Sequence, residues 1–260
     1  MILLAKVFFV PLMIALIALL GRRYGARAAG LMSGFPIIGG PIVYFVYWEQ
    51  GAVFALQASE ATLAGVVGLS SFSFVYAWLA PFWPWWLCLL AGWLVYAGSG
   101  LALAQVQLGA HAYALIAVVI LLAQIRWARP LQTVTASTPS STEIISRMLF
   151  AAVLVLSVTF LAQRLGPVTT GVLAAFPIAS SVIAVFSHHY YSPWHSVLAL
   201  RALKQGLLSL LAFFYALVVL AGYCSFNLAF GLAALVAVLV QLAVVFGRSG
   251  FLSQDKKAAS

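Results

Sequence analysis

The chain has 260 residues, of which 65% are hydrophobic and 7% charged, and its mean hydropathy is +1.12. Soluble domains contain about 45–50% apolar and 25% charged residues, so this composition excludes a soluble globular domain and indicates a protein that lies in the lipid bilayer. The net charge of +9 at pH 7 is better explained by orientation in the membrane than by nucleic-acid binding, and no nucleic-acid partner is expected.

Long apolar segments follow one another along the whole chain. A membrane-spanning helix needs roughly 20 mostly apolar residues, so we predict an all-α, polytopic membrane protein with about nine transmembrane helices. The predicted spans are 3–20, 28–48, 52–80, 84–104, 109–125, 144–162, 167–187, 194–221 and 226–246. They form one membrane domain over 1–260 and leave no room for a separate soluble domain.

The basic residues predict the orientation of these spans, because cytoplasmic loops collect Lys and Arg. With the N-terminus outside, only Lys6 and Arg164 lie outside. The cytoplasmic side then holds Arg22, Arg23, Arg27, Arg126, Arg129, Arg147, Arg201, Lys204, Arg248, Lys256 and Lys257. If the fourth and fifth spans were one span, most of the basic residues would lie outside instead of in the cytoplasm. We therefore expect a multi-pass protein with a cytoplasmic tail at 247–260.

Two parts of the chain repeat each other at an offset of 141 residues. The motif Gly-x4-Gly-x4-Phe-Pro-Ile occurs at 25–37 and again at 166–178, and the identities continue without a gap into the next span. The offset equals five spans, an odd number, so the copies should cross the membrane in opposite directions as inverted-topology repeats. The predicted organisation is repeat 1 over about 1–104, an extra span at 109–125, a linker at 126–143 and repeat 2 over about 144–246. An old duplication that serves only folding is the alternative.

Glycine and proline interrupt both copies near mid-membrane. Proline has no backbone N–H to donate, and irregular backbone at that depth must be covered by protein or line a wet cavity. We therefore predict two broken helices whose half-helix N-termini form a substrate site; prolines that only kink helices for packing are the alternative. The candidate substrate-binding residues are Gly34, Phe35, Pro36, Gly39, Gly40, Pro41, Phe176, Pro177, Ser180 and Ser181.

One acidic and one basic residue occupy equivalent positions in the third and eighth spans, Glu60 and Arg201. An ionisable group inside a span is costly and usually functional. The two residues are therefore candidates for a charge pair, or Glu60 for a coupling proton carrier. If the apolar core begins only at Ala61, both are ordinary interfacial residues. There is no nucleotide-binding loop, nucleophile elbow or paired carboxylate motif, so we assign no catalytic residue, metal site or cofactor, which favours a protein that is not an enzyme.

The window 28–36, Ala-Ala-Gly-Leu-Met-Ser-Gly-Phe-Pro, followed by Tyr44, resembles the Ala-Gly-Leu-x3-Phe-Pro segment of the small GlpM-like bacterial inner-membrane proteins. The copy at 170–177 resembles that segment less closely. The resemblance covers a small part of the chain and implies a location in the bacterial inner (cytoplasmic) membrane. The organisation as a whole is similar to that of inverted-repeat secondary transporters with discontinuous helices, which is an architectural analogy.

These features together predict a transporter that moves a small, anionic or zwitterionic solute by alternating access. A negatively charged group on the solute is expected because cationic groups and helix N-termini outnumber carboxylates near the proposed site. One alternative is a membrane-embedded enzyme or lipid-handling protein acting on a lipid-linked substrate through Glu60, His188 and Arg201. A passive channel or an assembly subunit is another. The expected partners are the bilayer and the solute, and a homo-oligomer stays open.

Overall fold

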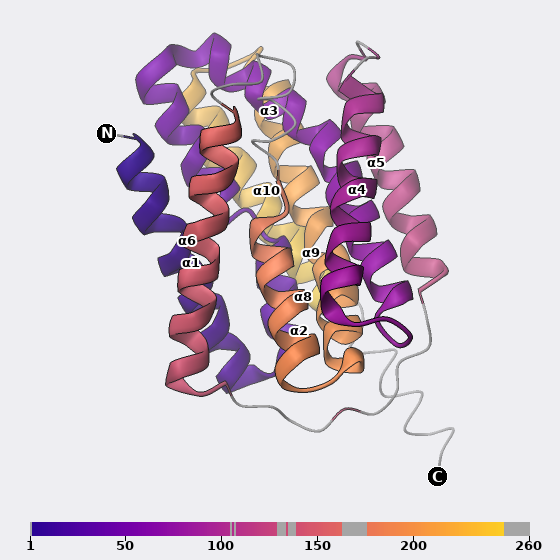
Figure 1. Ribbon diagram of the computed structural model, residues 1–260. Helices are drawn as coiled ribbons and strands as arrows, with labels where there is room; N and C mark the ends of the chain where they lie inside the picture. Colours follow the sequence, from indigo (N-terminus) through magenta and orange to yellow (C-terminus); the bar gives the residue numbers. More distant parts are fainter. Residues whose placement is uncertain are drawn as a thin grey trace.

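The computed structural model of the chain describes residues 2–104, 106, 108–128, 134, 139–162 and 176–246. Within these residues every regular element is an α-helix and there is no strand, which confirms the all-α prediction. The helices are α1 (Ile2–Tyr24), α2 (Ala26–Gly34), α3 (Gly39–Leu79), α4 (Trp85–Ala104), α5 (Ala110–Arg126), α6 (Ser141–Ala162), α8 (Ile178–Tyr190), α9 (Pro193–Leu220) and α10 (Phe226–Phe246), arranged as one bundle (Figure 1).

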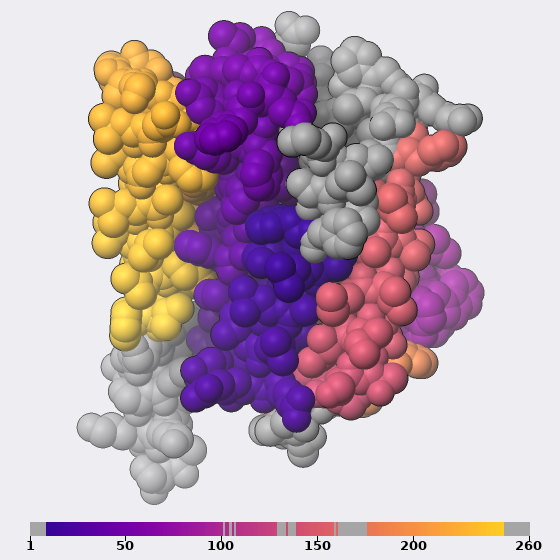
Figure 2. All heavy atoms as spheres, turned by 90° about the vertical axis from the view of Figure 1, so that its left-hand side faces the viewer, coloured from indigo at the N-terminus to yellow at the C-terminus, as the bar shows by residue number. Residues whose placement is uncertain are grey.

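Several of these helices are suited to a membrane. In the part of the chain that the structure describes, four helical segments are long and apolar enough to cross a membrane, namely Ala26–Leu79, Ser141–Val158, Pro193–Leu220 and Phe226–Phe246. Helices on the outer face of the bundle direct large apolar side chains outward, among them Leu12, Leu16, Leu149, Val153, Phe160, Leu235 and Leu239. Figure 2 shows this face, with α10 in yellow, the α2–α3 region in purple, α1 in indigo and α6 in salmon. So much exposed apolar surface matches hydrocarbon better than water, and the helices indicate a membrane protein.

The chain runs up and down the bundle, and α2 and α8 cover only part of its height (Figure 1). Figure 1 shows α1 descending to the lower end, α2 rising from there and ending inside the bundle, and the start of α3 continuing to the upper end. Helix α8 begins inside the bundle and descends, and α9 then rises along the full height. Residues 163–175, where the first half of the predicted seventh span falls, lie outside the described residues, as do 129–133 and 135–138 of the linker and the whole tail.

Two glycines with positive φ make the sharp changes of direction near the N-terminus. Gly25 has φ 87° and ψ 170° between α1 and α2, and Gly51 has φ 82° and ψ 174° inside α3. This backbone region is essentially restricted to glycine. Gly51 therefore divides α3 into segments 39–50 and 52–79, which matches the predicted boundary between the second and third spans.

Helix α9 lies at the centre of the bundle, in contact with α2, α3, α5, α8 and α10. Its approach to α2 is very close. A Cβ added at Gly206 would collide with the carbonyl oxygen of Leu31 and lie 2.9 Å from Cα of Gly34, and a Cβ at Gly30 would collide with the carbonyl oxygen of Ala199. Small residues at such positions allow two helix backbones to touch, a recurrent form of helix packing in membranes.

The helices recur at the same offset of 141 residues as the sequence motifs. The second segment of α3 covers 52–79 and α9 covers 193–220, while α4 begins at residue 85 and α10 at residue 226. A packing contact recurs as well. Phe9 lies against Phe45 with ring centroids 6.4 Å apart, and the equivalent rings of Phe150 and Phe186 are 6.0 Å apart. The two halves of the chain therefore share helix bounds and one aromatic contact.

Candidate functional site

The first Phe-Pro-Ile motif interrupts the path of the chain between α2 and α3. Phe35 has φ −77° and ψ 152°, the extended conformation favoured before proline. The Ile37 N–H donates to the Phe35 carbonyl at 2.8 Å, which closes a tight turn around Pro36, and the Gly40 N–H donates to the Pro36 carbonyl at 2.9 Å as α3 begins. The helix is therefore interrupted at the first Phe-Pro-Ile motif, between α2 and α3.

The second motif has the same backbone pattern before α8. The Ile178 N–H donates to the Phe176 carbonyl at 2.7 Å, and the Ser181 N–H donates to the Pro177 carbonyl at 2.9 Å. Pro177 has φ −74° and ψ 56°, close to the inverse γ-turn. Each bond joins residues 141 positions after those of the first motif. The two prolines thus produce the same turn, and each turn is followed directly by a helix.

Each turn leaves the N-terminus of a helix inside the bundle. The first amides of a helix have no partner within it, and the helix dipole adds partial positive charge there. Within the described residues, no backbone acceptor is recorded for the amides of Gly39 in α3 and of Ser180 in α8. The Ser180 hydroxyl donates to the Pro177 carbonyl at 3.1 Å. These helix starts favour an anionic group.

Both turns are enclosed by protein. Pro36 and Pro177 are buried, and Ile38 after the first turn packs against the same buried cluster as Phe176 and Ile178 of the second. The prolines therefore do not face the outer surface, and the two turns border a common apolar core.

The neighbours of the turns fill the space around them. A Cβ added at Gly39 would lie 3.3 Å from the ring of Phe214 in α9, and one at Gly40 would lie 3.6 Å from Phe213. Gly34 abuts Gly206, Phe35 packs on the cluster around α9, and Pro41 is half-buried. The first turn is therefore closed by side chains of α9 in this conformation.

The second turn is closed by α4. The Phe176 ring lies 5.3 Å from Trp93 and 5.7 Å from Tyr96, measured between centroids. The indole N–H of Trp93 donates to Ser181 Oγ at 3.0 Å. The side chain of Ser181, a predicted site residue, therefore has a polar partner on another helix.

Lys204 is a functional candidate that the sequence analysis placed only among the cytoplasmic cations. It is 1% exposed, and its Nζ lies 5.0 Å from the centroid of the Phe74 ring, a cation–π distance. It follows the start of α9 by eleven residues, or about 16 Å of helical rise. This distance from the start of an apolar helix was the feature of the sequence that could have identified Lys204 as a buried cation.

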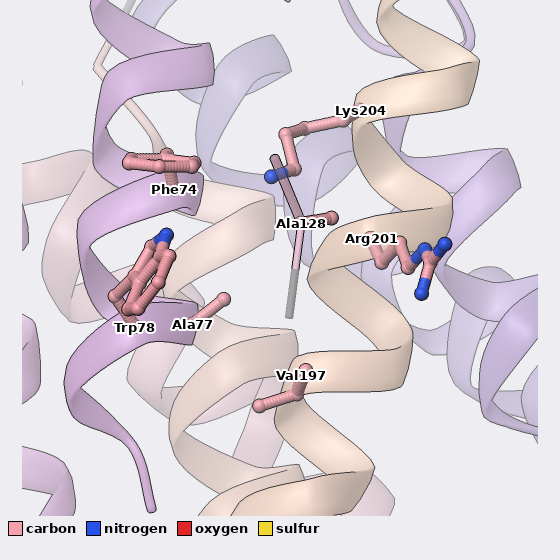
Figure 3. A pocket seen from close by; sticks show the side chains of 7 residues that line it. All are labelled: Phe74, Ala77, Trp78, Ala128, Val197, Arg201 and Lys204. Carbon is pink, nitrogen blue, oxygen red and sulfur yellow. The ribbon is translucent and has the colours of Figure 1, made fainter. Parts of the chain in front are cut away.

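Lys204 lines a small pocket between the second segment of α3, the end of α5 and α9. The lining residues are Phe74, Ala77, Trp78, Ala128, Val197, Arg201 and Lys204. In Figure 3, Lys204 reaches toward Phe74, whereas Arg201 extends away from it. The cavity volume is only about 10 Å³, room for about one water molecule, so the lining side chains must move apart before a solute can enter.

The structure does not bring Glu60 and Arg201 together. Arg201 lines the pocket that contains Phe74, whereas Glu60 precedes Phe74 by fourteen residues on the same continuous helix, or about 21 Å of rise. No ion pair joins the two residues in the described part of the chain. This geometry corrects the charge-pair hypothesis, and proton carriage by Glu60 stays a prediction.

A buried network at the lower end of the bundle was missed, because Glu143 was assigned to a loop. Arg147 Nη2 lies 2.6 Å from Glu143 Oε1, and the Tyr191 hydroxyl donates to Glu143 Oε2 at 2.6 Å. Burial, with the hydrogen bond to Glu143, raises the pKa of the Tyr191 phenol. The network joins the first turn of α6 to the turn between α8 and α9. The four-residue spacing of Glu143 and Arg147 was its only sequence signal.

Comparison with known proteins assigns no family to these observations. No protein-family model, no curated protein and no solved structure matches the chain.

Proposed function

We propose that the chain is a membrane transporter that moves a small anionic or zwitterionic solute by alternating access between its two halves. The observation that carries this proposal is the pair of equivalent Phe-Pro-Ile turns, each buried and each followed directly by a helix. Helices interrupted at matched positions of two repeats are the usual place of substrate sites in transporters. The candidate binding residues are those around Pro36 and Pro177.

The halves are proposed to be inverted-topology repeats within nine spans. The shared offset of the helix bounds, the turns and the phenylalanine pairs supports this organisation. The end of α1, the start of α2 and the end of α5 all lie at the lower end of the bundle in Figure 1. These segments carry Arg22, Arg23, Arg27 and Arg126. We therefore place the lower end in the cytoplasm, with the N-terminus outside. The resemblance to GlpM-like proteins supports the bacterial inner membrane.

The solute charge follows from the groups near the turns. Two helix N-termini, at Gly39 and Ile178, favour negative charge. Lys204 adds a cation. It lies on the same turn of α9 as Leu203 and Gly206, which touch the end of α2. The side chains that now close the turns, Phe214 and Trp93, must move for a solute to enter. The structure therefore corresponds to a closed conformation in this proposal.

An uptake screen in reconstituted vesicles tests the proposed function. Vesicles with the wild-type protein and vesicles without protein are incubated with labelled pools of organic acids, amino acids, sugars and organic cations. We expect saturable uptake of an acid or an amino acid that the empty vesicles lack. Uptake from none of the pools, or uptake restricted to a sugar or a cation, contradicts the proposal. Uptake that rises linearly with solute concentration indicates a channel.

A further inference from the structure

Lys204 is a buried cation, and no carboxylate of the described residues lies beside it. A buried ammonium group is costly unless an opposite charge or several hydrogen bonds compensate for it, and a cation–π contact with Phe74 offsets only part of this cost. The acidic residues of the described part are Glu49, Glu60 and Glu143. Glu143 is engaged by Arg147 and Tyr191, and the other two belong to α3 many residues before Phe74. None of them neutralises Lys204.

The pocket in front of Lys204 combines this charge with apolar walls. Two aromatic residues, Phe74 and Trp78, and three aliphatic residues, Ala77, Ala128 and Val197, make up the remaining lining apart from Arg201. In Figure 3 the ammonium group of Lys204 lies on the Phe74 side of α9, and the guanidinium of Arg201 is directed away from Phe74. A ligand would therefore meet the ammonium group of Lys204 on a largely apolar surface, with Arg201 at the edge of the pocket. Such a site selects a single negative charge attached to an apolar body.

The pocket is also connected to the first turn through α9. Leu203 and Gly206, on either side of Lys204, are the residues whose backbones touch Gly34 at the end of α2. Ala128 follows the end of α5, at the end of the bundle that we place in the cytoplasm. A ligand at Lys204 would therefore lie between that end and the interrupted helices.

We infer that Lys204 binds the carboxylate of a small monocarboxylate whose apolar body lies against Phe74 and Trp78. This inference rests on the proposed function, since it names the class of solute that the transporter carries. The carboxylate supplies the charge that Lys204 lacks in the described structure, and the aromatic side chains replace water around the apolar body. The site is the cytoplasmic approach to the two turns.

Equilibrium binding of labelled benzoate to the purified full-length protein in nanodiscs tests the inference. We expect saturable binding that Lys204→Gln weakens at least tenfold and that Lys204→Arg largely keeps. Phe74→Leu weakens binding less than Lys204→Gln does. The matched control is Arg126→Gln, which removes an exposed cation at the same end of the bundle and should leave the dissociation constant unchanged. Absence of saturable binding, or equal binding by Lys204→Gln, overturns the inference.

Three competitors test the ligand class. Benzylamine and benzyl alcohol should not displace labelled benzoate, because they lack the negative charge. Inorganic phosphate should displace it poorly, because it lacks the apolar body. Displacement by phosphate as effective as by unlabelled benzoate would show that the site recognises charge alone and would overturn the assignment to monocarboxylates.

A stability measurement keeps the inference testable if a variant binds poorly for another reason. Lys204→Met keeps a long side chain and removes the buried charge, so the melting temperature of the unliganded protein should rise. Benzoate should raise the melting temperature of the wild-type protein and not of this variant. A lower melting temperature for unliganded Lys204→Met would show a structural role and contradict the inference.

The two proposals fail in distinguishable ways. If benzoate binds through Lys204 but vesicles take up no solute, the proposed function fails and the binding site stands. If vesicles take up a solute at the same rate with Lys204→Met as with the wild type, the function stands and the inference fails.

Discussion

Replacing both motif prolines, Pro36→Ala together with Pro177→Ala, is expected to abolish solute uptake while the protein stays folded in the membrane. At position 36, alanine removes the restraint that keeps Phe35 extended and adds a backbone N–H that can continue α2. At position 177 alanine likewise adds a backbone N–H. The turns would then lose the geometry that leaves the amides of Gly39 and Ser180 available to a solute. The measurement is the initial uptake rate in vesicles, for the solute that the screen identifies.

The control for this experiment is Pro84→Ala, since Pro84 is exposed in the turn between α3 and α4. This variant should keep the wild-type rate. Size-exclusion profiles and the fraction of protein in the membrane check that the double variant folds and inserts. Wild-type uptake by a folded double variant would exclude the turns as the substrate site.

Replacing Gly206 with leucine is expected to prevent the bundle from forming. Even the Cβ of this side chain would collide with the backbone of Leu31 and Gly34, and backbone atoms cannot rotate away as a flexible side chain can. Separating α2 from α9 would open the core around Ala199 and Leu203. Overpacking costs about 1–3 kcal/mol in ordinary cores, and a direct backbone collision should exceed that range. The yield of monodisperse protein and its melting temperature measure the effect.

Gly231→Leu is the matched control, because Gly231 lies in α10 with open space where a Cβ would be built. It should yield folded protein with a melting temperature at or above that of the wild type, since glycine costs about 1 kcal/mol relative to better helix formers. If Gly206→Leu melts at the wild-type temperature, the close contact between α2 and α9 is wrong.

Local chemistry explains the parts of the fold that the sequence predicts well. Apolar length alone indicates the helices, and the geometry of proline indicates the turns at Pro36 and Pro177. Gly51 ends the first segment of α3 because its backbone conformation is nearly restricted to glycine. Each of these features depends on a few neighbouring residues, so a single sequence contains the necessary information.

The features that the sequence analysis missed depend on contacts between distant segments. The spacing of Gly30 and Gly34 signals a tight helix contact, but its partner at Gly206 becomes visible only when α9 is placed beside α2. From the sequence, Lys204 is expected to be a cation at the membrane interface, and only the packing of α3 against α9 shows that it is buried. In each case the role of the residue depends on which other helix covers it, and this cannot be calculated from the hydropathy of one helix.

The charge-pair hypothesis failed for a geometric reason. Glu60 and Arg201 each lie eight residues after the first residue of their helical segment, at 52 and 193. The second segment of α3 descends while α9 ascends in Figure 1, so equivalent positions fall toward opposite ends of the bundle. Equivalent positions in two antiparallel helices are therefore far apart unless they lie near the middle of those helices.

Cysteine accessibility at Ser181 tests the central claim, that the interrupted helices border a route that opens to water. Ser181 is fully buried, so a protein fixed in the described conformation would protect a cysteine there. In a background with Cys88→Ala and Cys224→Ala, we expect a membrane-impermeant thiol reagent to label Ser181→Cys from each side of the membrane, and the solute to slow labelling. Val153→Cys, on the apolar outer face, should stay unlabelled as the control. Absence of labelling at Ser181→Cys from both sides would contradict alternating access at these turns.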